Sequence, residues 1–149
     1  MKTKLIIIFL FLGTVLMAGN PDQIIGYWLT SEGNSQIEIY KERGKYYGKI
    51  VWLEEPYNDD GNIKKDKDNP DDALKDRPLL GLKILKGFEY DNGDNEWDDG
   101  KIYDPEVGKT YDCYMWFDGD PDKLKVKGYI GFSVIGRSTT WRRENAKRD

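Results

Sequence analysis

Short strand-like runs separated by turn signals are the feature that most constrains the fold of this chain. Residues 35–42 alternate apolar and polar side chains, with Ile37 and Ile39 on one face. Arg43-Gly44 then leads into a second run at 45–53. Two alternating runs joined by so short a turn predict a β-hairpin with one face toward a core.

The same pattern continues to the end of the chain. Further strands are expected at 26–30, 79–90, 96–103 (interrupted at Asp99-Gly100), 109–117, 123–130 and 137–143. Successive hairpins of about eight strands predict an all-β fold, a single antiparallel up-and-down β-barrel or strongly curved sheet.

Tryptophans stand at both ends of this series. Trp28 follows Gly26 in the first run, and Trp141 precedes Arg142 and Arg143 in the last. In a closed barrel the first and last strands are neighbours. A Trp ring of one strand is therefore expected to lie under an Arg guanidinium of the other and to seal one end of the barrel.

The strand pattern stops at residues 54–78. Asn69 as N-cap and Pro70 as first residue predict a single helical turn inside this loop. A loop of such length between strands is often functional. Arg77, next to Pro78, can either bind a carboxylate or phosphate or hold the loop to the barrel.

The first 19 residues resemble a secretory signal peptide. Lys2 and Lys4 precede the apolar run 5–12, and Ala18 and Gly19 are small residues suited to cleavage. Cleavage near Ala18 or Gly19 would leave one domain, 20–149, in the periplasm or outside the cell. An uncleaved N-terminal anchor is the alternative.

Composition excludes several classes of site. The chain has no histidine, which excludes Ser-His and Cys-His dyads and histidine-bound zinc. Cys113 is the only cysteine, so no internal disulfide forms; its apolar neighbours predict a small buried side chain, with a reactive thiol as the alternative. The net charge is −4, and loss of Lys2 and Lys4 makes it more negative, which disfavours binding to nucleic acid.

Neither membrane insertion of the mature chain nor a metal or other cofactor is expected. Lysines on the outward face of 123–130 belong in water rather than in lipid. The acidic residues of 66–72 do not fit a calcium-loop spacing, which leaves solvated loops as the simpler interpretation and weak calcium binding as the alternative.

Many aromatic residues fall on the strand runs. They either fill a small core or line a cavity for an apolar or sugar-like ligand, since an eight-stranded barrel can hold one small ligand. On the second interpretation, the candidate ligand-binding residues are Trp28, Tyr47, Arg77, Tyr103, Tyr111, Arg137 and Trp141.

A set of motifs running in order along the chain resembles a known family. They are Gly26-x-Trp28, Tyr47-Gly48-Lys-Ile50, Asp66-x-Asp68-Asn69-Pro70, Arg77-Pro78-Leu79-x-Gly81, Gly100-x-Ile-Tyr103-Asp104-Pro105, Gly108-Lys-Thr-Tyr111, Leu124-x-Val-x-Gly128-Tyr-x-Gly131 and Gly136-Arg137-x-x-x-Trp141-x-Arg143. Together they resemble the domain of unknown function DUF2147. The resemblance implies an exported bacterial protein with a lipocalin-like β-barrel, and it supplies no catalytic residues. Lys75 departs from the arginine usual there, which removes any bidentate role.

Three functions remain open. The first is a non-catalytic barrel that binds a small hydrophobic or amphipathic ligand in the periplasm. The second is a structural or interaction protein of the cell envelope that acts through the 54–78 loop. The third is a histidine-free isomerase or cyclase that uses Asp104, Tyr103 and Arg137.

Overall fold

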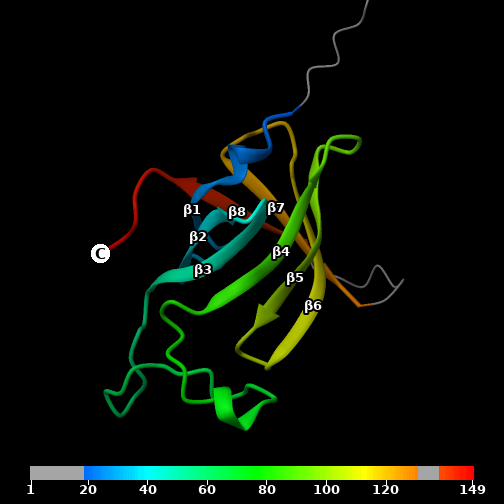
Figure 1. The fold of residues 1–149 in the computed structure, drawn as a ribbon. Coiled ribbons are helices and arrows are strands. Elements are labelled where there is room, and N and C mark those ends of the chain that lie inside the picture. The colour runs from blue at the N-terminus through cyan, green and yellow to red at the C-terminus, as the bar shows by residue number, and fades with distance from the viewer. Residues whose placement is uncertain (1–18, 131–137) are drawn as a thin grey trace, which may run out of the picture.

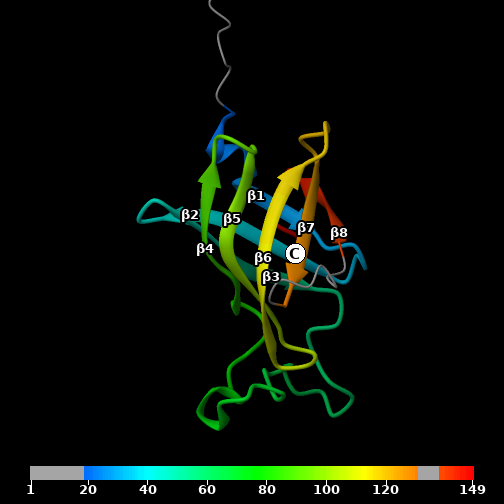
Figure 2. The ribbon, with the colours of Figure 1, turned by 90° about the vertical axis from the view of Figure 1, so that its right-hand side faces the viewer.

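The computed structural model describes residues 19–130 and 138–149, and within them eight antiparallel strands close into a barrel in chain order (Figures 1 and 2). The strands are β1 (Gly26–Leu29), β2 (Ser35–Glu42), β3 (Lys45–Leu53), β4 (Lys83–Asp91), β5 (Glu96–Asp104), β6 (Lys109–Phe117), β7 (Lys123–Tyr129) and β8 (Ser138–Glu144). The expected all-β, up-and-down barrel is confirmed. The signal segment 1–18 and Arg137 lie outside the described residues.

The barrel closes where β1 pairs with β8. Trp28 lies opposite Arg143 in this pair, and the Arg143 guanidinium carbon lies 4.2 Å from the centre of the Trp28 ring. The guanidinium also donates hydrogen bonds to the backbone oxygens of Gln23 (2.6 Å) and Pro121 (3.2 Å). The predicted stack of an Arg on a Trp at the barrel seam is therefore confirmed.

One end of the barrel is filled and covered. The short 3-10 turn η1 (Pro21–Ile24) lies across this end, at the top of Figure 1. The indole N–H of Trp28 donates to the Ile24 carbonyl (2.9 Å), and that of Trp97 donates to the Pro21 carbonyl (3.0 Å). Both indoles are buried, so large rings fill this half and leave their N–H groups satisfied.

Small corrections concern β4 and β5. Residues 79–82 are not part of β4, which begins at Lys83: the Leu82 amide donates to the Leu79 carbonyl in a turn, and the Gly81 amide donates to the Ile50 carbonyl of β3 (2.7 Å). Strand β5 is continuous through Asp99, which takes a left-handed φ of 54° in a bulge of the ladder. Asp99-Gly100 was expected to interrupt the strand, but the bulge accommodates these two residues and the strand continues.

The helical turn in the long loop is the 3-10 turn η2 (Asp72–Leu74), and its N-cap is Asp71. The expected cap, Asn69, is wrong by two residues. The Asn69 side chain is buried, where its amide donates to Asp66 (2.7 Å) and Tyr103 (3.2 Å). These buried bonds, rather than helix capping, account for its position.

Cys113 is fully buried inside the barrel, which confirms it as a small core side chain. Burial raises the pKa of its thiol to about 12. Within the described residues no helix has both the length and the apolar character needed to cross a membrane.

Candidate ligand-binding site

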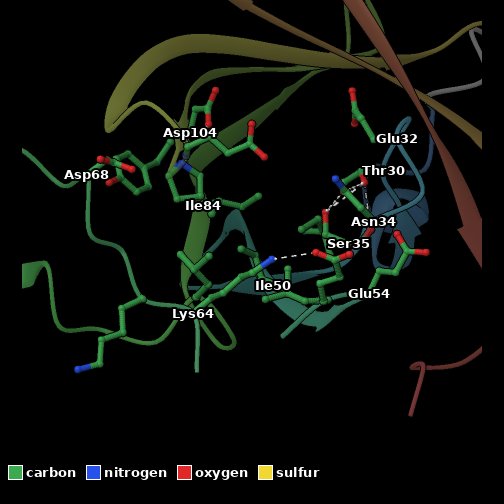
Figure 3. Close-up of a pocket in the computed structure, with 18 of the residues that line it drawn as sticks. Thr30, Glu32, Asn34, Ser35, Ile50, Glu54, Lys64, Asp68, Ile84 and Asp104 are labelled. Carbon is green, nitrogen blue, oxygen red and sulfur yellow. Dashed lines mark hydrogen bonds and ion pairs between the residues drawn. The ribbon is translucent and has the colours of Figure 1, made fainter. Parts of the chain in front are cut away.

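A pocket opens at the end of the barrel opposite η1, where the β1–β2, β3–β4 and β5–β6 connections lie (Figure 3). It has a volume of about 1430 Å³. Inward-facing aliphatic side chains form much of its wall, chiefly Ile37, Ile50, Ile84 and Ile102. The pocket therefore combines an apolar interior with an entrance between loops.

The pocket exists because the two halves of the barrel carry side chains of different size. Trp28, Trp97 and Phe88 are buried toward the covered end. Toward the open end the inward positions are mainly aliphatic, with Ile37, Ile50 and Ile84 among the pocket lining. A Cβ added at Gly128 would meet Ile102 and Tyr111, which line the pocket, at 3.5 Å, an ordinary contact distance. The rings of Trp28, Trp97 and Phe88 fill one half of the barrel, and the mainly aliphatic side chains of the other half leave it hollow.

A buried polar cluster joins the long β3–β4 segment to the barrel beside the pocket. The Asp66 carboxylate is fully buried and accepts hydrogen bonds from the Tyr103 hydroxyl (2.5 Å), the Asn69 amide (2.7 Å) and the Arg77 guanidinium (3.0 Å). Asp66 lies in the loop, whereas Tyr103 lies in β5. We refer to Asp66, Asn69, Arg77 and Tyr103 as the latch cluster.

The latch cluster changes the acid–base behaviour of Tyr103. Burial, and then the hydrogen bond to Asp66, raise the pKa of the Tyr103 hydroxyl to about 12. Ionising it would place a second negative charge beside the buried carboxylate. The hydroxyl is therefore neutral at ordinary pH and serves as a hydrogen-bond donor.

Backbone contacts reinforce the latch cluster. The amide of Asp66 donates to the Arg77 carbonyl, and the amide of Leu79 donates to the Lys64 carbonyl, both at 2.9 Å. The β5–β6 turn approaches so closely that a Cβ on Gly108 would lie 1.8 Å from the Asp68 carbonyl oxygen. The β3–β4 segment is thus held as one wall of the pocket.

Three of the candidate residues line the pocket: Tyr103, Tyr111 and Trp141. Trp28 does not line it, because its ring is buried at the covered end. Tyr47 lies on the outer face of β3, since Tyr46 before it takes the inward position. There it stacks on Tyr40 (6.0 Å between ring centres) beneath the Lys83 ammonium, 4.6 Å from its ring.

Arg77 belongs to the latch cluster and does not line the pocket. Its ion pair with Asp66 lies within the β3–β4 segment, so Arg77 acts on the barrel through Asp66, which accepts the hydrogen bond of Tyr103 in β5. Arg137 lies in a part of the chain that the structure leaves undescribed. Asp104 lines the pocket, and its carboxylate accepts a hydrogen bond from the Glu106 amide (2.9 Å) in the β5–β6 turn.

Sequence reasoning missed the isoleucines of the pocket wall and the acidic residues of its entrance, including Glu32, Glu54 and Glu106. Isoleucine in an alternating strand signals only an inward face, whether that face is packed or hollow. Across the described part of the chain, no three His, Cys, Asp or Glu side chains lie close enough together to hold a metal ion.

Comparison with known proteins agrees with this architecture. Residues 26–143 match the family described as "Uncharacterized protein conserved in bacteria (DUF2147)". The chain belongs to the DUF2147 family. No curated protein matches the sequence. Among solved structures, this DUF2147 chain is similar to protein HP1028 from the human pathogen Helicobacter pylori, described as belonging to the lipocalin family. The two are 26% identical, with a TM-score of 0.68 over 82% of this chain and 83% of the other.

Proposed function

We propose that this protein is an exported, non-catalytic carrier that binds one small hydrophobic or amphipathic ligand in the open half of its barrel. The proposal rests on the pocket in the open half of the barrel, which has isoleucines in its wall, while the other half is filled by side chains and covered by η1. Small-molecule sites are concave and mostly apolar, with a few polar groups near the entrance.

The size of the pocket suits such a ligand. Its volume of about 1430 Å³ exceeds that of most drug-sized sites because it extends between the loops. At about 25 cal/mol per Å², burying roughly 200 Å² of apolar ligand surface would contribute about 5 kcal/mol. Similarity to a protein described as a lipocalin is consistent with this use of the fold, since lipocalin barrels hold one small ligand.

A non-catalytic role accords with the chemistry of the pocket. Tyr103 is occupied by Asp66, and its pKa of about 12 makes it a poor proton donor or acceptor near neutral pH. The proposal that the protein is exported is supported by the N-terminal sequence, in which Lys2 and Lys4 precede an apolar run as in a signal peptide.

The proposal is tested by titrating the mature chain with the neutral fluorescent probe N-phenyl-1-naphthylamine. A saturable rise in fluorescence is expected. Gly128→Leu should weaken it, because the new side chain would press on Ile102 and Tyr111, which line the pocket. Lys127→Leu, on the outer face of the same strand, is the matched control and should still bind. Absence of saturable binding in the parent protein would contradict the proposal.

A second candidate function draws on exposed apolar side chains of the β3–β4 segment. Tyr57 is 58% exposed and Leu80 is 52% exposed, both outside the barrel proper. They would suit a contact with an envelope partner. If this is their role, Tyr57→Ser with Leu80→Ser should remove partner capture from envelope extracts while the melting temperature stays near that of the parent.

A further inference from the structure

Carboxylates outnumber lysines around the entrance of the pocket. Six Asp and Glu residues line it, against three lysines. Two of these lysines are already neutralised by ion pairs, Lys64 with Glu55 (3.4 Å) and Lys65 with Asp76 (3.0 Å). Apart from these pairs, the lining charges in the described residues are five carboxylates and Lys67.

The five carboxylates come from three different connections between strands, so no single turn motif accounts for them. Glu32 belongs to the β1–β2 connection, Glu54 follows β3, Asp68 lies in the β3–β4 segment, and Asp104 and Glu106 stand at the β5–β6 turn. Figure 3 shows Asp68 and Asp104 on one side of the hollow and Glu32 and Glu54 on the other. Ile50 and Ile84 lie between the two groups.

Local structural roles explain only part of this arrangement. Asp104 accepts a hydrogen bond from the Glu106 amide, and Glu32 accepts one from the Ser31 hydroxyl (2.8 Å). Such bonds leave the negative charge in place. For Glu54 and Glu106 the structure gives no side-chain hydrogen bond or ion pair within 19–130 and 138–149. The undescribed segment 131–137 has one charged residue in its sequence, Arg137, so it cannot reverse the balance.

We propose that the ligand is a cationic amphiphile, with an apolar tail against the isoleucine wall and an ammonium-type head group among the carboxylates of the entrance. This inference rests on the proposed carrier function and narrows its ligand class. A cleft lined by one sign of charge concentrates ligands of the opposite sign and repels those of its own. The rings of Tyr111 and Trp141, which also line the pocket, attract cations as well.

Fatty acids are therefore disfavoured as ligands. The carboxylate head of a fatty acid at the entrance would face several negative charges, and among the described lining residues Lys67 is the one cation outside the two ion pairs. At separations near one Debye length, the difference between a cationic and an anionic head is expected to be about five- to tenfold in affinity at low salt.

The test uses three ligands with the same alkyl tail: dodecyltrimethylammonium, dodecanol and dodecanoate. Each displaces N-phenyl-1-naphthylamine from the full mature protein, produced with its own leader, at concentrations below micelle formation. The cation is expected to bind about five- to tenfold more tightly than the anion, with the alcohol between them. The ratio should shrink as salt is added, because screening weakens exposed charges.

Paired variants test whether the entrance causes the preference. Glu54→Gln with Glu106→Gln should lower the cation-to-anion ratio about threefold, since two of the five carboxylates lose their charge. Asp94→Asn with Asp118→Asn makes the same charge change at exposed turns of the covered end and should leave the ratio unchanged. Both pairs lie in exposed turns, so folding of the barrel is not at risk.

The outcomes separate the two proposals. Equal or tighter binding of dodecanoate would overturn the cationic preference and leave the carrier function standing. A cation preference that the two pairs of variants change equally would show that net charge, not the entrance, is responsible, which also overturns the inference. Failure of all three ligands and of the fluorescent probe would remove the carrier function itself.

Discussion

Removing one hydroxyl from the latch cluster should release the pocket wall. Tyr103→Phe deletes the donor that lies 2.5 Å from the fully buried Asp66 carboxylate. A hydrogen bond to a charged group contributes about 1.5–3 kcal/mol, and a buried carboxylate that loses a donor keeps its desolvation cost. We expect the free energy of unfolding to fall by about 2 kcal/mol, roughly a thirtyfold rise in the unfolded-to-folded ratio.

Tyr111→Phe is the matched control. Tyr111 also lines the pocket, on the neighbouring strand, and the structure gives its hydroxyl no hydrogen bond to another described residue. Its loss should change stability by less than about 0.5 kcal/mol. Urea unfolding followed by tryptophan fluorescence measures both variants.

Hydrogen exchange distinguishes a local release from a global one. In Tyr103→Phe the amides of Asp66 and Leu79, which bond within the β3–β4 segment, should exchange faster than the loss of global stability explains. Asp66→Ala should also cost at least about 1 kcal/mol less in the Tyr103→Phe background than alone. Equal stabilities for Tyr103→Phe and Tyr111→Phe would refute the reasoning, as would additive effects of the two latch substitutions.

Three further predictions concern other parts of the barrel. Arg143→Lys should lower the free energy of unfolding by about 2 kcal/mol, because an ammonium cannot donate the forked hydrogen bonds to the Gln23 and Pro121 carbonyls. The control is Arg142→Lys at the exposed neighbouring position. It should change the free energy of unfolding by less than about 0.5 kcal/mol in the same urea titration. Burial raises the pKa of Cys113 from 9.0 to about 12, so the unfolded chain loses this proton first and stability should fall as pH rises above 9. Between pH 9 and 10 the slope should be visibly smaller in Cys113→Ala, and an unchanged slope would contradict the assignment. Gly108→Ala should destabilise by at least about 2 kcal/mol and speed amide exchange in the β3–β4 segment, because its Cβ would collide with the Asp68 carbonyl; native exchange rates there would count against this contact.

Local signals in the sequence predict most of the barrel. Alternation and the Arg43-Gly44 turn define the β2–β3 hairpin, and the turn takes the left-handed φ values of 49° and 80° that such hairpins need. Closure of the barrel makes β1 and β8 neighbours, and for this reason the stack of an arginine on Trp28 could be predicted from the sequence. The strand ends and the bulge at Asp99 were harder to predict, because a β-bulge can accommodate an unfavourable residue without ending the strand.

The site was harder to predict, because its members meet through long-range contacts. Asp66 and Tyr103 are separated by 37 residues, and nothing in either neighbourhood specifies the other. Their motifs were nonetheless visible: the segments around Asp66, Arg77 and Tyr103 each carried part of the resemblance to DUF2147. Tyr47 was misplaced because aromatic type does not reveal which face of a strand points inward; its neighbour Tyr46 takes that face.

The covered end of the barrel limits how a ligand could enter and leave the pocket. The turn η1 lies at the end opposite the pocket (Figure 1), and the buried Trp28 and Trp97 indoles fill the barrel between them. If the proposed ligand binds in the pocket, it must leave by the entrance through which it came, so uptake and release would compete for one route.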